Sequence, residues 1–363
     1  MLKSQLLKYS LTNLVFAIAI AATSFAQQSF QSISPGNKLI QYEGRVGFDD
    51  PAAAKIYWAG SSVTIRFTGT ELKTTLKDER GHNYFNVIID NDSIQRLKPD
   101  TLKKTYTLAT GLSKGEHTIQ LFKRTDAKAG MTFFYGFEVS ADSKILNVPV
   151  KKRSIEFYGN SITVGSGISE GKFPGGDENN YLSYAAVTAR HFNARYSCIA
   201  RSGIGLMVSW FDLIMTEMYN RLDPDNSTSK WDFSKNIPDV VVVNLLQNDN
   251  ALVGMPEHEQ FKKRFGDKPP TEEYITQTYS RFIKTIRNNY PNAHIICTLG
   301  SMDAVRPGSP WPGYIKSAVA MLKDRKIYTH FFARINSDDH PNVQEQHEMA
   351  DSLIKFIEQH IKW

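Results

Sequence analysis

Short apolar runs separated by turn residues characterise the chain between Gln41 and Ser140. The runs are rich in β-branched and aromatic residues, and breakers such as Thr68-Gly69 and Asp90-Asn91-Asp92 separate them. No long helical period intervenes, which favours an antiparallel β-sandwich. The predicted strands are Ser62 to Phe67, Glu71 to Thr75, Tyr84 to Ile89, Lys104 to Leu108, His117 to Phe122 and Met131 to Glu138.

The pattern changes near residue 150, where apolar strands begin to alternate with amphipathic helices. This alternation is typical of an α/β domain with a parallel sheet covered on both faces. Helical spacing marks segments around Tyr184, Ile283 and Ile354, whereas 223–235 and 257–270 are interpreted as loops. The predicted strands are Ser154 to Tyr158, Arg195 to Ala200, Val240 to Leu245 and His294 to Leu299.

The N-terminal segment has the pattern of an export signal. Lys3 and Lys8 precede the apolar run LVFAIAIAA, and Ser24-Phe25-Ala26 offers small residues at a cleavage site. A membrane anchor is the alternative, but the run is short of the roughly 20 residues that cross a bilayer. We therefore predict a signal peptide over 1–26, a sandwich domain over 27–150 and an α/β domain over 151–363, with a secreted or periplasmic product that has no membrane attachment after cleavage.

Charge and cysteine content narrow the function classes. The chain has 43 Lys and Arg against 37 Asp and Glu, a net charge of +6, and loss of Lys3 and Lys8 would leave +4. These charges are scattered, so nothing indicates nucleic-acid binding. The only cysteines are Cys198 and Cys297, which are too few for a framework of several disulfides. A single disulfide bond between them is one alternative, but two unpaired, buried thiols are favoured. No CxxC or HExxH spacing indicates a metal site.

A serine follows the first predicted strand of the α/β half. In Gly159-Asn160-Ser161 a strand enters a small-residue turn, which places the Ser161 hydroxyl at the carboxyl edge of the sheet. Ligands of open α/β sheets bind at that edge, so Ser161 is a candidate nucleophile. Helix capping would explain the same serine, and the short match is weak without its companions.

Among nine histidines, His340 stands out because carboxylates precede it and because it lies at the entrance of the last helix. An imidazole acting as a base needs an acceptor for its Nδ1 hydrogen, and Asp338 or Asp339 could supply it. Two further strand ends carry hydrogen-bond donors suited to an oxyanion. Gly203 allows close approach of a backbone N–H, and Asn248 offers an amide.

Taken together and in this order, Ser161, Gly203, Asn248 and His340 resemble the blocks of the SGNH, or GDSL, hydrolase superfamily. The preceding half, with KIYWAGSSVTIRFTGT, GLSKGEHTIQLFKRT and FFYGFEV, is similar to the jelly-roll domain of carbohydrate esterase family two. The resemblance implies an acetyl esterase acting on plant polysaccharides such as xylan or glucomannan. It implies Ser161 as nucleophile, His340 as base and an oxyanion hole of Gly203 and Asn248.

The sequence departs from the superfamily pattern at three places. Asn160 replaces the aspartate of GDS, Leu246-Gln247 replaces the usual Gly-x before Asn-Asp, and Ser337 stands where DxxH places its acid. An Asp-x-His-Pro segment implies Asp338 as the acid instead, with a backbone carbonyl as the alternative. The implied mechanism needs no metal or organic cofactor.

Alternatives remain for the function and for two aromatic residues. A carbohydrate-binding protein with a silent α/β half, or an esterase of other acetylated glycans, would share many of these features. Trp311 and Phe173, in Pro- and Gly-rich segments, are equally interpreted as sugar-stacking surfaces or as packing anchors.

Overall fold

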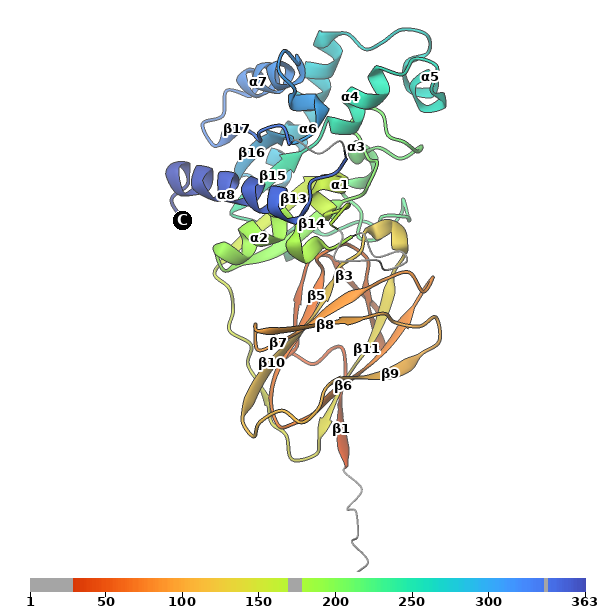
Figure 1. Cartoon of the computed structure of the whole chain (residues 1–363), viewed down its shortest axis with the longest axis vertical. Coiled ribbons are helices and arrows are strands. Elements are labelled where there is room, and N and C mark those ends of the chain that lie inside the picture. The colour runs from red at the N-terminus through yellow and green to blue at the C-terminus, as the bar shows by residue number, and fades with distance from the viewer. Residues whose placement is uncertain (1–28, 169–177, 336–338) are drawn as a thin grey trace, which may run out of the picture.

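The computed structural model describes residues 29–168, 178–335 and 339–363. Two layered units are stacked along the long axis, with the β-sandwich at one end and the α/β unit at the other (Figure 1). The change from antiparallel to parallel pairing falls between Leu146 and Arg153. Within the described ranges, no helix combines the length and the apolar character needed to cross a membrane.

The sandwich consists of two antiparallel sheets, and the chain crosses between them at most of its connections, as in a jelly roll. All six predicted strands are confirmed, with ends within three residues of those predicted. The others are short or carry mostly exposed polar residues, as in β8, so the apolar pattern did not reveal them. One sheet contains β1(Phe30–Ile33), β3(Val46–Asp50), β4(Ala53–Ile56), β6(Leu72–Asp78), β9(Lys104–Ala109) and β11(Thr132–Ser140), and the other β2(Gln41–Glu43), β5(Ser62–Thr68), β7(Phe85–Ile89), β8(Ser93–Leu97), β10(Glu116–Lys123) and β12(Ile145–Leu146).

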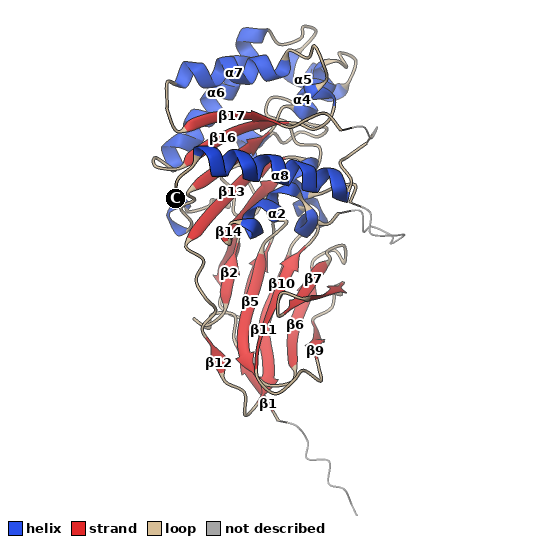
Figure 2. Cartoon of the chain, turned by 60° about the vertical axis from the view of Figure 1, so that its left-hand side comes forward, coloured by secondary structure: helices blue, strands red, loops and turns tan. Residues whose placement is uncertain are grey.

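The α/β unit has a five-stranded parallel sheet in the order β14-β13-β15-β16-β17. Helices α2 and α8 cover one face and α6 and α7 the other (Figure 2). The strands are β13(Arg153–Gly159), β14(Ala194–Ala200), β15(Val240–Asn244), β16(His294–Leu299) and β17(Ile327–Phe331). The helices are α1(Ser161–Val164), α2(Tyr184–His191), α3(Met215–Met218), α4(Gln247–Val253), α5(Glu259–Phe265), α6(Glu272–Asn289), α7(Trp311–Leu322) and α8(Val343–His360).

Some loop predictions in this half were wrong. Helix α5 lies within the predicted loop 257–270, and β17 and α7 had not been predicted.

Trp311 is the first residue of α7, where prolines are tolerated because the first helical N–H groups have no partner inside the helix. Its side chain is 6% exposed and packs in the core, so the sugar-stacking interpretation of Trp311 is wrong. Phe173 lies outside the described residues.

The two cysteines are free and buried, as favoured from the sequence. Cys198 belongs to β14 and Cys297 to β16, and two other strands separate these in the sheet. Burial raises the pKa of each thiol to about 12. Both side chains therefore act as small apolar residues of the core.

Both halves contribute to the same hydrophobic cores. Tyr57 and Trp58 of the sandwich belong to the cluster beneath α6 and α7, whereas Ile88 and Phe122 belong to the cluster beneath α2 and α8. The Trp58 indole also donates a hydrogen bond across the interface to the carbonyl oxygen of Leu222, over 2.7 Å. Contact between the halves therefore includes a large buried apolar part, which restricts their relative motion.

Arg45 extends this contact with a buried charge. It lies between β2 and β3, and its fully buried guanidinium enters the α/β half. Nη1 donates to the carbonyl oxygens of Tyr219 and Arg221 at 2.6 and 2.9 Å. Nη2 donates to the Tyr158 hydroxyl at 3.1 Å and lies 3.5 Å from Oε1 of buried Glu156. The carboxylate of Glu156 accepts further hydrogen bonds from the side chains of Tyr158, Tyr290 and Ser197.

The Arg45 network makes a prediction for stability. Arg45→Met removes the cation but leaves Glu156 buried, so the free energy of unfolding should fall by about 3–5 kcal/mol. Denaturant titration would measure the fall. The matched control is Lys55→Met, which breaks the solvent-facing pair with Asp49 and should cost about 1 kcal/mol or less. Equal losses in the two variants would contradict a special role for the buried pair.

Candidate active site

The strand order places three of the predicted site residues at one point of the sheet edge. The chain proceeds from β13 outward to β14 and then returns to the other side of β13 with β15. Ser161 follows β13, Gly203 follows β14 and Asn248 follows β15. Carboxyl ends of strands that flank such a reversal open a crevice, where doubly wound sheets bind their ligands.

The turn into α1 presents Ser161. Asn160 caps this short helix, because its side-chain oxygen accepts a hydrogen bond from the Ile162 amide at 3.0 Å. An aspartate would make the same cap, so the Asn160 departure preserves the local geometry. Gly159 is required here, since a Cβ atom would lie 2.0 Å from the Thr163 hydroxyl. The side chain of Ser161 lines a pocket although the residue is only 6% exposed.

His340 lies within hydrogen-bond distance of both predicted kinds of partner. Its Nε2 is 2.7 Å from Ser161 Oγ, and its Nδ1 is 2.7 Å from Asp339 Oδ1. An acceptor at Nδ1 favours the tautomer that leaves Nε2 free to take a proton. The loop approaches Gly167 closely, because a Cβ there would lie 2.7 Å from His340 Cβ.

Among the described residues, Asp339 is the one whose carboxylate lies at the imidazole of His340. The same Oδ1 also accepts the backbone N–H of His340 at 2.7 Å. These hydrogen bonds, that from the His340 side chain foremost, lower the pKa of Asp339. Asp338, the residue implied by the family resemblance, lies outside the described residues. Asp339 was one of the two aspartates left open by the residues themselves.

Backbone donors for an oxyanion are present beside Ser161. The amide nitrogens of Ser161 and Gly203 donate to no acceptor within the described part of the chain. Gly203 has a φ of +83°, and a Cβ at this position would lie 3.2 Å from the Phe211 ring. Glycine therefore meets both the conformational and the steric demand of this turn.

The Asn248 amide is oriented by two neighbours. Its Oδ1 accepts from the Trp210 indole at 3.0 Å, and its Nδ2 donates to the Ile204 carbonyl oxygen at 2.7 Å. An indole N–H is only a donor, so the amide orientation is unambiguous, and the second N–H of Nδ2 has no acceptor among the described residues. Sequence reasoning missed Trp210, which is 44% exposed and carries no motif of its own.

The side chain of Asp249 fixes the loop after β14, which contains Gly203 and Trp210. Its fully buried carboxylate accepts hydrogen bonds from the amides of Leu206, Met207 and Val208. Burial raises the pKa of Asp249 to about 6, while these three amides oppose the rise. Leu246, which stands in place of the family's glycine, has a φ of +80°, in the left-handed region that favours glycine. This conformation costs a residue other than glycine about 1–2 kcal/mol in backbone strain.

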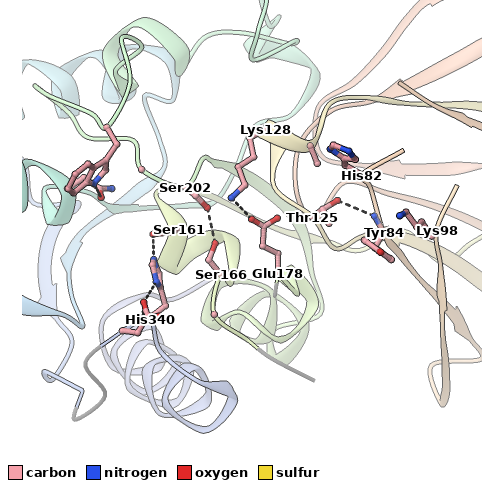
Figure 3. Close-up of a pocket in the computed structure, with 16 residues that line it drawn as sticks. His82, Tyr84, Lys98, Thr125, Lys128, Ser161, Ser166, Glu178, Ser202 and His340 are labelled. Atoms are coloured by element: carbon pink, nitrogen blue, oxygen red, sulfur yellow. Dashed lines mark hydrogen bonds and ion pairs between the residues drawn. The ribbon is translucent and has the colours of Figure 1, made fainter. Parts of the chain in front are cut away.

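One pocket of about 860 Å³ lies at the junction of the two halves (Figure 3), and it is lined by Ser161, Gly203, Trp210, Asn248, Asp339 and His340. The α/β half contributes the Ser161–His340 pair, and the sandwich contributes the opposite wall. Sequence reasoning missed that wall because it arises from contact between distant segments. Its residues are His82, Tyr84, Lys98, Thr125, Lys128 and Ala129.

Metal coordination finds no support in the side-chain arrangement. Among the described residues, no group of three or more His, Cys, Asp or Glu side chains gathers in a way that could hold an ion.

Comparison with known proteins supplies the context for this geometry. Residues 42–149 match the family described as carbohydrate esterase 2 N-terminal. Among curated proteins, the chain is 34% identical to the cellulase/esterase CelE of Acetivibrio thermocellus over 92% of its own length, although it spans only 41% of that relative. It is 24% identical to an acetylxylan esterase / glucomannan deacetylase of Cellvibrio japonicus, with 97% of this chain and 98% of the relative covered.

A solved structure extends the match across both halves. It is that of a family two carbohydrate esterase from Clostridium thermocellum in complex with cellohexaose, with a TM-score of 0.77 and 34% identity. The alignment covers 88% of this chain and 98% of that one. With this identity over nearly the whole of the solved esterase, the chain belongs to carbohydrate esterase family two and has the SGNH-hydrolase fold of that family.

Proposed function

We propose that this protein removes O-acetyl groups from carbohydrate by a serine esterase mechanism. The observation that carries the proposal is the continuous hydrogen-bonded series from Asp339 through His340 to Ser161. It is accompanied by the amides of Ser161 and Gly203, which donate to no acceptor among the described residues. A nucleophile within reach of a base that is itself oriented by a third group is the arrangement that acyl transfer requires.

In the first half-reaction, Ser161 Oγ attacks the acetyl carbonyl carbon while His340 Nε2 takes the hydroxyl proton. The carbonyl oxygen becomes an oxyanion that accepts hydrogen bonds from the amides of Ser161 and Gly203 and from Asn248 Nδ2. The bond to the sugar oxygen then breaks, and that oxygen leaves with the proton from His340. In the second half-reaction, water loses a proton to His340 and attacks the acetyl carbonyl carbon. The bond from that carbon to Ser161 Oγ then breaks, Ser161 Oγ recovers the proton from His340, and acetate is released.

The proposed substrate is an acetylated plant polysaccharide, xylan or glucomannan. Relatives of this chain are named acetylxylan esterase / glucomannan deacetylase. The pocket supports a sugar ligand, because hydroxyl, amide, ammonium and imidazole groups line it together with exposed Trp210. We further propose that the protein is exported, on the strength of the signal pattern over 1–26.

Acetate release decides the function. The parent protein should release acetate from acetylated xylan or acetylated glucomannan, and a Ser161→Ala variant with matched melting temperature should release none. Release by both proteins would remove Ser161 from the mechanism. Hydrolysis of p-nitrophenyl acetate alone would keep the chemistry and reject these polysaccharides. If the parent hydrolyses no ester but still binds the glycans, the protein is a carbohydrate-binding protein instead.

The Asn248 amide makes a separate kinetic prediction. Asn248→Ala removes one oxyanion donor, so kcat for p-nitrophenyl acetate should fall about 10²- to 10³-fold. Asn250→Ala, two residues further along α4 and outside the pocket lining, is the matched control and should retain parent turnover. Full turnover in Asn248→Ala would exclude this residue from the oxyanion hole.

The two aspartates can be separated by paired substitutions. Asp339→Asn should lower kcat/KM more than tenfold, because an amide holds the imidazolium less well than a carboxylate. The 88% exposure of the Asp339 side chain should keep the loss below the roughly 10⁴-fold of buried triad aspartates. Asp338→Asn should change kcat/KM less than about threefold, well short of the loss expected on removing a triad acid. The reverse order of effects would assign the acid to Asp338.

A further inference from the structure

The turn after β10 of the sandwich extends to the loop that follows β14. It carries Asp126, which is fully buried. Its Oδ2 accepts the backbone N–H of Ser202 at 2.7 Å, and its Oδ1 accepts that of Lys128 at 3.0 Å. One carboxylate oxygen therefore caps its own short turn, while the other crosses the interface between the halves.

Ser202 directly precedes Gly203, whose amide is one of the proposed oxyanion donors. The Ser202 hydroxyl lies 2.8 Å from the Ser166 hydroxyl, and the Gly203 carbonyl oxygen accepts from the Trp210 amide at 3.1 Å. The peptide unit that carries the Gly203 N–H is thus held on both sides, and the anchor at its N-terminal side comes from the other half of the chain.

We propose that Asp126 is a positioning residue for the oxyanion hole, through which the sandwich directs the Gly203 amide toward the pocket. The inference rests on the proposed function. It assigns the sandwich a part in catalysis without contact between Asp126 and the substrate.

The turn that holds Asp126 is itself well braced. The Asp126 amide donates to Glu178 Oε2 at 2.9 Å, and Glu178 Oε1 pairs with the Lys128 ammonium at 2.7 Å. Buried Lys123 donates to the carbonyl oxygens of Tyr57 and Asp126 at 2.7 and 3.2 Å. Because these contacts fix the position of Asp126, its carboxylate can in turn fix the position of the Ser202 amide.

The use of a carboxylate here also supports a positioning role. Burial of a charge costs several kcal/mol unless hydrogen bonds compensate it, and apolar contacts already join the two halves. A buried acid at this interface is therefore unnecessary for docking alone. What it adds is a directional acceptor for one particular N–H next to the nucleophile.

The test compares Asp126→Ala and Asp126→Asn with a matched control, Trp58→Phe. The control removes another buried hydrogen bond across the same interface, that from the indole to Leu222, and Trp58 does not line the pocket. For p-nitrophenyl acetate, kcat should fall about 10- to 100-fold in Asp126→Ala, somewhat less than on loss of a donor itself, while KM changes less than about threefold. Asp126→Asn, which retains one acceptor oxygen, should recover part of kcat, and Trp58→Phe should keep kcat at the parent value.

A second readout separates this inference from the proposed function. Amide hydrogen exchange across 199–206 should be faster in both Asp126 variants than in the control, and Asp126→Asn carries the test if Asp126→Ala does not fold. Unchanged exchange, or a kcat for Asp126→Ala within twofold of the control, would overturn the inference. A parent protein without esterase activity would instead overturn the proposed function, and faster exchange would then uphold only the anchoring of Ser202 by Asp126.

Discussion

Parallel pairing of five strands is the constraint on which the rest of the structure depends. Every strand of such a sheet delivers its carboxyl end to the same edge, so the turns after β13, β14 and β15 meet there regardless of their separation along the chain. Ser161, Gly203 and Asn248 each follow one of these strands, and Ser161 and Asn248 lie in the first turns of the helices α1 and α4. His340 reaches the same edge from the start of α8, which packs across the sheet.

The sandwich packs against the α/β half and forms part of the pocket at this edge of the sheet. Its aromatic residues belong to both hydrophobic cores of the α/β half. The guanidinium of Arg45 is buried in the α/β half beside Glu156, and residues of the sandwich form one wall of the pocket. Because the two halves share buried apolar surface, separating them would expose both cores to water. The family's N-terminal region thus has a physical reason to accompany the esterase half.

Two departures from the superfamily pattern show how the fold tolerates substitution near the site. Asn160 makes the helix cap that an aspartate would make, since the cap needs only a side-chain oxygen. Leu246 adopts a backbone region that favours glycine, and its fully buried side chain offsets the strain through packing. In both cases the residue present meets the local requirement of its position.

The sequence by itself predicted most of the elements in their order, the change from sandwich to α/β architecture and the candidate site residues Ser161, Gly203, Asn248 and His340. The elements follow from local periodicity, which neighbours along the chain largely dictate, whereas the roles of the four residues were implied by the family resemblance. Tertiary structure decided the rest, because it depends on contacts between distant segments. It brought Asp339 to the imidazole, buried Trp311, placed Trp210 against Asn248 and set Asp126 of the sandwich on the amide of Ser202. A local sequence pattern does not predict which segment of one half packs against which segment of the other.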